Sequence, residues 1–383
     1  MSTIKANKLE HISTSNGGIQ LDNAGHVTID GQQLPTAGAL SNRNLVINGA
    51  MQISQRGDDF QPPADGEYTL DRFQAYQSSA DAYDVQRVTD TPSNQGFKNS
   101  LKVTSNAATS IAAGGYYYLG QRIEGNNWVK MGYGASGAKT CTVSFWVKSS
   151  LTGTFSGVLK NSAQNRSLVF EYTISSADTW EYKQVTIAGD TSGTWLTGSG
   201  TGAWVYFSIG VGTTFATGTA NTWQATNLVG TTGSVDLVET SGATWFMTGL
   251  QVEEGEKATP FEFRSYGDEL ARCQRYYQRA SASSGSAYAR CIPLGHMATN
   301  NILRVVVPLH PPMRAQPSFN FSGSFATQPN VGTPGLSLET SNSAGGESVT
   351  LVDSSSISGT VGNCISIAAS NDDDAYMEFS AEL

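Results

Sequence analysis

The sequence predicts an all-β protein: an N-terminal β arm, a large antiparallel β-sandwich of the jelly-roll type, one connecting α-helix and a small C-terminal β-sandwich. Three observations support this fold class. Short runs of alternating apolar and polar residues recur along the chain, with the period of half-buried strands. Turn residues separate the runs, and Gly alone occurs 41 times. Charged residues make up only 14%, while 39% hydrophobic residues can build sizeable cores.

Residues 1–40 predict the β arm. The runs IQL at 19–21 and VTID at 27–30 alternate and are separated by Asn- and Gly-rich turns, which indicates short strands and hairpins. So short a segment cannot bury a core by itself. We therefore expect the arm to need sister chains or a larger assembly, and a disordered, tag-like arm is the alternative.

Residues 41–265 predict one large β domain. Its strand patterns are NLVING (44–49), LDRFQAY (70–76), YDVQRV (83–88), NSLKVTS (99–105), CTVSFWVKS (141–149), SLVFEYTI (167–174), EYKQVTIAG (181–189), AWVYFSIGV (203–211) and TWFMTGLQVEE (244–254). Their spacing is typical of a two-sheet sandwich or jelly roll. Alternation in TVSFWVKS places Val143, Phe145 and Val147 on one face. Trp146 falls on the other face, so we expect it to point away from the main core.

Residues 266–281 predict the linking helix. The run YGDELARCQRYYQRA contains no Pro and many good helix formers. Asp268 and Glu269 fall in the first turn, and Arg275 and Arg279 lie near the end. This charge order is favourable for the helix dipole.

Residues 282–383 return to a β pattern. The runs SAYARCIPLGHM and ILRVVVPLHPPMR flank a turn at 298–301, and shorter strand patterns follow. These residues predict a small C-terminal β domain, and the helix before them marks the boundary with the large domain.

Charge and hydropathy exclude two classes of partner. The net charge is −9 and no Lys/Arg-rich run occurs, so we expect no nucleic-acid binding. No window approaches 18 apolar residues, and the first residues lack the apolar core of a secretory signal. We therefore expect no membrane insertion. We also expect that the protein is made in a host cytoplasm.

The four cysteines indicate free thiols. Cys141, Cys273, Cys291 and Cys364 are far apart and form no CxxC pair, which argues against both a zinc site and a disulfide framework. We expect buried thiols, as in proteins made in a reducing cytoplasm.

The sequence carries no recognisable catalytic set. It has four His and no G-x-S-x-G elbow. Carboxylates are scarce in the large domain, and no spacing selects the pair that glycan cleavage needs. The default candidates for such a pair are Asp65, Asp71, Glu124, Glu171, Asp178 and Glu181. We therefore expect a protein that is not an enzyme.

Surface recognition remains, and the aromatic residues favour carbohydrate as the ligand. Aromatic faces stack on sugar rings, and Asn, Gln and Asp side chains bond hydroxyls. Trp128, Trp195 and Trp223 lie in loop-like stretches rich in Gly, Thr and Asn. They are the candidates for exposed stacking residues, and packing in the core is the alternative for each.

Several blocks resemble tail fibre and virion structural proteins of tailed bacteriophages. They are NRNLVINGAMQISQRG (42–57), LDRFQAY (70–76), TVSFWVKS (142–149), TGLQVEEGEKATPFEFRSYGDELARCQRYYQ (248–278) and PPMRAQPSF (311–319). The sandwich also resembles the carbohydrate-binding modules with a galactose-binding-like jelly roll, whose closing strand reads like Leu250 to Phe261 here.

The resemblance implies a tail fibre or receptor-binding protein on the virion that attaches the particle to host-surface glycan. It implies a homotrimer and contact of residues 1–40 with other tail or virion proteins. It also implies a structural calcium ion, although the sequence shows no EF-hand loop and no ligands can be assigned. Two alternatives stay open: a structural virion component, such as a tail adaptor, knob or capsid-associated fibre, and a glycan-degrading tailspike.

Overall fold

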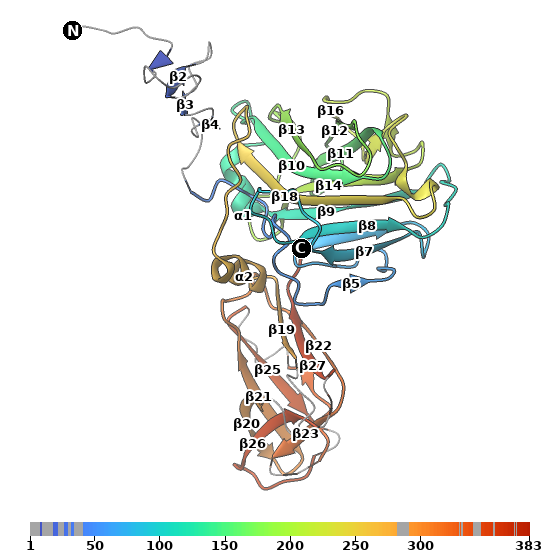
Figure 1. Ribbon diagram of the computed structural model, residues 1–383. Helices are drawn as coiled ribbons and strands as arrows, with labels where there is room; N and C mark the ends of the chain where they lie inside the picture. The colour runs from blue at the N-terminus through green and yellow to red at the C-terminus, as the bar shows by residue number, and fades with distance from the viewer. Residues whose placement is uncertain are drawn as a thin grey trace, which may run out of the picture. The chain divides into compact units, whose positions relative to one another are not determined.

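The chain folds into two compact units, Met1–Arg264 and Ser265–Leu383. The computed structural model describes residues 8–9, 18–21, 27–29, 32–33, 41–281, 291–328, 330, 332–339, 346–354, 357–370, 372 and 374–383. Figure 1 shows that strands dominate both units. The predicted all-β class is confirmed.

Two six-stranded antiparallel sheets form the body of the first unit (Figure 1). In spatial order, sheet I contains β13 (Glu181–Ile187), β10 (Cys141–Ser149), β18 (Thr244–Glu254), β8 (Ser100–Ser105), β7 (Tyr83–Val88) and β5 (Asp59–Phe60). Sheet II contains β16 (Trp223–Gln224), β12 (Ser167–Ile174), β11 (Gly153–Asn161), β14 (Thr201–Val211), β9 (Tyr116–Glu124) and β6 (Phe73–Gln77).

Short elements complete this unit. They are the parallel pair β15 (Ala216–Thr217) and β17 (Gly230–Thr231), helix α1 (Gly125–Trp128) and the 3₁₀ turns η1 (Val129–Met131) and η2 (Leu237–Glu239). The arm contains β1 (Lys8–Leu9), β2 (Ile19–Leu21), β3 (Val27–Ile29) and β4 (Gln32–Gln33), joined in an antiparallel sheet. The runs predicted at 19–21 and 27–30 therefore contain strands, and the rest of the arm lies outside the described residues.

Aromatic rings fill the space between the two sheets. Phe145 of β10 meets Phe207 of β14 edge to face, with ring centroids 4.8 Å apart. The Trp245 indole N–H donates to the Tyr172 hydroxyl at 3.1 Å, so the polar atoms of these two buried rings satisfy each other. The core therefore depends on rings contributed by both sheets.

The outer face of sheet II carries a second aromatic cluster. Tyr76 stacks on Tyr118 with centroids 4.8 Å apart, and Tyr118 meets Tyr206 edge to face at 5.2 Å. Lys160 lies fully buried beside it. Its Nζ lies 5.2 Å from the centroid of Tyr118 and 5.1 Å from that of Trp204. The cluster therefore encloses a cation.

Lys160 has neutral rather than acidic hydrogen-bond partners. Its Nζ donates to the side-chain oxygens of Gln164 and Asn227, at 3.1 Å each. Burial, and then the positive charge of Arg122, lower the pKa of Lys160 from 10.5 to about 7. The folded protein therefore loses this proton at a lower pH than the unfolded chain does.

The predicted strand at 44–49 is wrong. These residues form a buried loop, because Asn48 adopts the left-handed φ of 61°, which no strand continues. The Gln121 side chain takes the place of a neighbouring strand. It accepts from the Ile47 N–H at 2.8 Å and donates to the Ile47 carbonyl at 2.7 Å. A side-chain amide thus satisfies backbone groups that a sheet would otherwise pair.

The second unit is also antiparallel β. A three-stranded sheet contains β19 (Tyr277–Ser281), β27 (Tyr376–Ser380) and β22 (Ser318–Ser322). A six-stranded sheet contains β23 (Phe325–Gln328), β26 (Cys364–Ala369), β20 (Cys291–Thr299), β21 (Ile302–Pro308), β25 (Ser348–Asp353) and β24 (Ser337–Leu338). The turn predicted at 298–301 joins β20 and β21.

The predicted helix of residues 266–281 is shorter than expected. Helix α2 spans Tyr266–Gln274, and the Ser265 side chain caps its start by accepting the Asp268 N–H at 3.2 Å. The chain leaves the helix because Tyr277 pairs with Ser380 of β27 and is buried there. A strand ladder with the end of the chain thus overrides the local helical preference.

The expectation of buried thiols holds in part. Cys141 and Cys273 are free and buried, whereas Cys364 is free and exposed. Cys364 is the first residue of β26, and alternation turns its neighbour Ile365 into the core instead. The Cys291 side chain lies outside the described residues. Across the described part of the chain, no helix is long and apolar enough to cross a membrane.

We predict that Lys160 makes the folded protein more stable as the pH rises above neutral. Between about pH 7 and pH 10.5 the unfolded chain holds the proton that the folded protein has lost, so stability rises with pH in this window. Lys160→Met removes this contribution and lowers the slope by up to ~1.4 kcal/mol per pH unit. Urea unfolding from pH 7 to 10 measures the slope. Exposed Lys98→Met is the control, and equal slopes for parent and Lys160→Met would refute the prediction.

Candidate functional site

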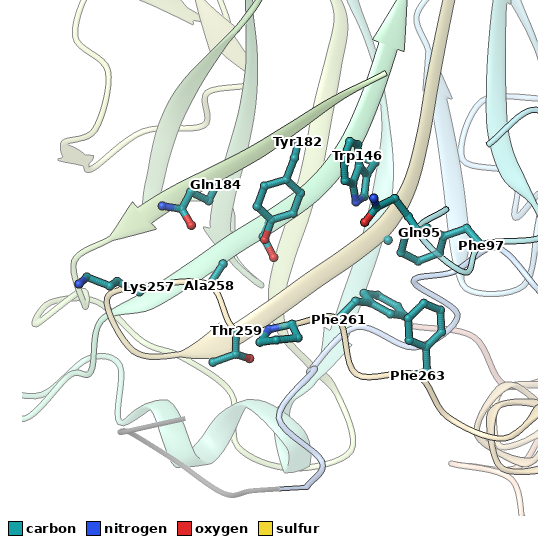
Figure 2. Close-up of a pocket in the computed structure, with 13 residues that line it drawn as sticks. Gln95, Phe97, Trp146, Tyr182, Gln184, Lys257, Ala258, Thr259, Phe261 and Phe263 are labelled. Atoms are coloured by element: carbon teal, nitrogen blue, oxygen red, sulfur yellow. The ribbon is translucent and has the colours of Figure 1, made fainter. Parts of the chain in front are cut away.

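A cleft lies on the outer face of sheet I, within the first unit, and has a volume of about 660 Å³ (Figure 2). Strands β10, β13 and β18, the turn before β8 and the segment after β18 contribute its walls. The lining residues are Gln95, Phe97, Ser144, Trp146, Tyr182, Gln184, Gly249, Lys257, Ala258, Thr259, Pro260, Phe261 and Phe263. This volume is typical of small-molecule and cofactor sites.

The period of β10 directs Trp146 into the cleft. Val143, Phe145 and Val147 are fully buried in the sandwich core. Because side chains alternate across a strand, Ser144 and Trp146 must face outward. The predicted orientation of Trp146 away from the core is confirmed, since it lines the cleft.

Trp146 and Tyr182 form an aromatic pair across β10 and β13. They are directly opposite in the strand register, and their ring centroids lie 5.4 Å apart with an interplanar angle of 53°. Tyr182 is 45% exposed. Burial, followed by the negative charge of Glu253, raises the Tyr182 pKa, although a hydrogen bond to Ser144 opposes this. The phenol is therefore protonated at neutral pH and can donate a hydrogen bond.

A β-bulge in β18 shapes the cleft beside Trp146. The register between β10 and β18 shifts between Ser144 and Trp146, where Gly249 adopts a φ of 65°. A Cβ at Gly249 would lie 2.6 Å from the Phe97 ring, so only glycine allows this close approach. Bulges of this type re-aim neighbouring side chains.

Three phenylalanines form an apolar surface at one end of the cleft. Phe97 lies 5.1 Å from Phe261 and 5.2 Å from Phe263, measured between ring centroids, and Phe261 and Phe263 are 4.9 Å apart. Phe263 remains 50% exposed. The cluster is therefore available to an apolar group of a ligand.

Hydrogen-bonding side chains are spaced along the same cleft. Gln95, Gln184 and Lys257 are exposed, and Thr259 is buried at the base. Figure 2 shows Gln184 and Lys257 on one side of Tyr182 and Gln95 on the other. The arrangement combines aromatic faces with amide, hydroxyl and ammonium groups, and none of the lining residues is a carboxylate, His or Cys.

The buried carboxylate of Glu253 fixes the segment that forms the lower wall. It accepts the Thr259 N–H at 2.8 Å and the Thr259 hydroxyl at 2.6 Å. It also accepts from the Gln251 side-chain amide at 2.8 Å and lies 3.9 Å from the Arg43 guanidinium. These charge-assisted contacts hold the wall against sheet I.

Glu262 provides a second anchor for the same segment. Its two carboxylate oxygens accept the backbone N–H groups of Arg43, at 3.2 Å, and Asn44, at 3.0 Å. Burial alone would raise the Glu262 pKa, but these N–H groups and the nearby arginine charges lower it overall. The block at 42–57 and the block at 248–278 therefore meet beside the segment that forms the lower wall.

The three tryptophans singled out from the sequence lie elsewhere. Trp128 is 1% exposed and Trp195 is 7% exposed, so the expectation that they are exposed is wrong. They stack with centroids 6.0 Å apart, and Trp223, half-buried, meets Trp195 edge to face at 5.5 Å. Tyr133 joins this cluster. Their Gly-rich loops fold onto the sandwich core, because removing the apolar surface of such large rings from water lowers the free energy of the folded state.

Sequence reasoning missed most of the cleft. Alternation could have identified Tyr182 in EYKQVTI, since it is the register partner of Trp146. No local signal brings Phe97 next to Phe261 and Phe263, because they come from turns far apart in the sequence. As for a calcium ion, no group of three or more His, Cys, Asp or Glu among the described residues could hold a metal.

We predict that Glu253→Gln lowers the free energy of unfolding by about 2 kcal/mol, because it removes charge-assisted bonds from a buried site. Chemical denaturation of the full chain measures the change. The control is Glu256→Gln at an exposed position, expected to change stability by less than about 0.5 kcal/mol. If Glu253→Gln is as stable as the parent protein, the Glu253 anchor is not important for the fold.

Known proteins resemble this chain only distantly. No family model matches it, and no curated protein matches it. Among solved structures, the enzymatically active domain of tailspike protein 4 from bacteriophage CBA120 is 14% identical with a TM-score of 0.31, over 55% of this chain and 21% of that one. The chain thus spans about a fifth of that tailspike.

Carbohydrate-binding modules form the other similar structures. TmCBM61 in complex with β-1,4-galactotriose is 12% identical with a TM-score of 0.28, over 56% of this chain and all (100%) of that one. The tandem CBM22-1–CBM22-2 of Paenibacillus barcinonensis Xyn10C is 8% identical with a TM-score of 0.29, over 90% of this chain and 98% of that one. These similarities are too distant to assign a ligand or an activity to this chain.

Proposed function

We propose that this protein binds glycan without cleaving it and that it attaches a phage particle to the host surface as a tail fibre or receptor-binding protein. The observation that carries the binding function is the outward-facing Trp146–Tyr182 pair, set in a cleft of about 660 Å³. Flat apolar faces beside hydrogen-bonding groups are what a sugar ring requires, since one face is lined by C–H groups and the rim by hydroxyls.

The polar groups of the cleft complement sugar hydroxyls. Gln95 and Gln184 each offer a carbonyl oxygen and an amide NH₂, so each can accept from one hydroxyl and donate to another. Tyr182 adds a phenolic donor next to the stacking surface. The cleft is open rather than enclosed, which suits a chain of sugars passing through it.

The composition of the cleft supports binding rather than hydrolysis. Glycan cleavage needs two carboxyl groups beside the scissile bond, and no Asp or Glu lines this cleft. Of the default carboxylates in the sequence, Asp71 accepts the Gln55 N–H at 2.8 Å, and Glu181 accepts the N–H groups of Ser175 and Ser176 at 2.8 Å each. Both carboxylates therefore make hydrogen bonds that stabilise the fold.

The virion role is supported by the sequence blocks that resemble tail fibre proteins. One of these blocks, 248–278, supplies lining residues of the cleft, and the block at 42–57 is hydrogen-bonded to it through Glu262. A homotrimer joined to other virion proteins through residues 1–40 completes this proposal. It would give the arm the partners that so short a segment needs.

The test is binding of the full chain to host-surface glycan. We expect Trp146→Ala and Tyr182→Ala each to weaken binding about tenfold, because each removes apolar contact worth roughly 1–2 kcal/mol. Glycan arrays followed by calorimetry on the best ligand measure the affinities, and release of reducing ends from the same polysaccharide detects cleavage.

Trp180→Ala is the matched control, since Trp180 is half-buried near sheet I but does not line the cleft. We expect it to leave glycan affinity unchanged. If the parent protein binds no host glycan, the receptor role fails and a structural role in the virion becomes the better explanation. Release of reducing ends would instead support a tailspike.

A further inference from the structure

We propose that Gln251 is a positioning residue for glycan binding. Its buried side-chain amide holds the wall of the cleft, residues 259–262, in the place from which Pro260 and Phe261 meet a ligand stacked on the aromatic pair. The inference rests on the proposed glycan-binding function and concerns the same site. Gln251 is not one of the lining residues, so it acts through the wall rather than on the ligand.

The Gln251 amide bonds the backbone on both sides of Pro260 and Phe261. Its Nε2 donates to the Thr259 carbonyl at 3.2 Å, and its Oε1 accepts the Glu262 N–H at 2.9 Å. This part of the chain follows the end of β18 and belongs to no strand. Side-chain bonds therefore replace the pairing that a sheet would give these backbone groups.

Gln251 faces outward from sheet I and is nevertheless fully buried. Its neighbours Leu250 and Val252 are buried in the sandwich core, so alternation turns Gln251 to the outer face. There it lies opposite Ser144 of β10 in the strand register, and Ser144 lines the cleft. The side chain that holds the wall thus stands beside the floor of the cleft and is closed off from solvent.

Glu253 fixes the orientation of the Gln251 amide. The same Nε2 also donates to the Glu253 carboxylate at 2.8 Å. A carboxylate can only accept, so the NH₂ end must face Glu253 and Thr259, which leaves the carbonyl end for the Glu262 N–H. A flipped amide would place its carbonyl against the carboxylate. The hydrogen bonds therefore select one arrangement of the wall.

A wall held in one arrangement favours binding. Figure 2 shows Phe261 below Trp146 and Tyr182, on the segment after β18. Without the Gln251 bonds the wall samples other arrangements, and only the fraction in the bound form accepts the ligand. The apparent affinity falls by that fraction, although no group that touches the ligand has changed.

The experiment compares the full chain with Gln251→Met, which keeps the length of the side chain and removes its hydrogen bonds. We expect polysaccharide purified from the host envelope to bind the variant about three- to tenfold more weakly, because two backbone bonds of the wall are lost. Calorimetry measures both affinities.

Gln74→Met is the matched control. Gln74 is also buried, and on sheet II its amide donates to the Gly66 carbonyl at 2.7 Å and accepts the Tyr206 hydroxyl at 3.1 Å. This variant should lose stability in the same way and keep the affinity of the parent protein. Equal weakening by both variants would show that lost stability, and not the position of the wall, lowers the affinity.

A double-mutant cycle separates positioning from a general structural role. Phe261→Ala removes the contact of the wall with the ligand, so adding Gln251→Met should weaken binding little further. Trp146→Ala leaves the wall in place, so the effect of Gln251→Met should keep its full size. An effect of the same size in both backgrounds contradicts a role through the wall.

Hydrogen exchange tests the Gln251 bonds without a ligand. The Glu262 N–H should exchange slowly in the parent protein and about tenfold faster in Gln251→Met. Fast exchange of this N–H in the parent protein would overturn the inference even if the variant does not fold. If Gln251→Met binds as tightly as the parent, the positioning role is refuted while glycan binding stands. If the parent binds no host polysaccharide, the proposed function itself fails.

Discussion

The alternation of β10 is the constraint on which the sandwich and its cleft both depend. Phe145 must enter the core to meet Phe207 of the other sheet, at 4.8 Å between ring centroids. A strand cannot bury Phe145 without turning Trp146 outward, and a slip of one residue would reverse both. Core packing therefore positions the tryptophan that we propose as the stacking residue of the cleft. The bulge at Gly249 then adjusts the neighbouring strand so that the Phe97 ring can approach.

A network of buried charges makes the cleft wall rigid. The segment after β18 has no strand partner along the cleft, so its backbone groups need side chains to satisfy them. Glu253 accepts the Thr259 N–H and Gln251 accepts the Glu262 N–H, while the Glu262 carboxylate accepts the Arg43 N–H. The Arg43 guanidinium also lies beside Glu253. Such a network stabilises the wall only while every member is present. The same network joins the loop that contains Arg43 to the segment that follows β18.

The sequence correctly predicted features that depend on one strand alone. It did not predict contacts between segments that are far apart in the chain. The period of CTVSFWVKS correctly predicted the buried and outward faces of β10, including Trp146. The composition around Trp128 and Trp195 predicted exposure wrongly, since loop composition does not reveal a fold-back onto the core. NLVING has the apolar content of a strand, but the Gln121 side chain satisfies the backbone of its Ile47 instead. The Phe97 and Phe263 contact is non-local and left no local signal.

The central claim is that glycan binds at the outward face of β10. Its most direct test follows the indole N–H resonances of the seven tryptophans while host-surface glycan is titrated into the full chain. The account predicts a saturable shift of the Trp146 resonance, with Trp128 and Trp195 unchanged because they are buried. An unchanged Trp146 resonance at saturating glycan would contradict it.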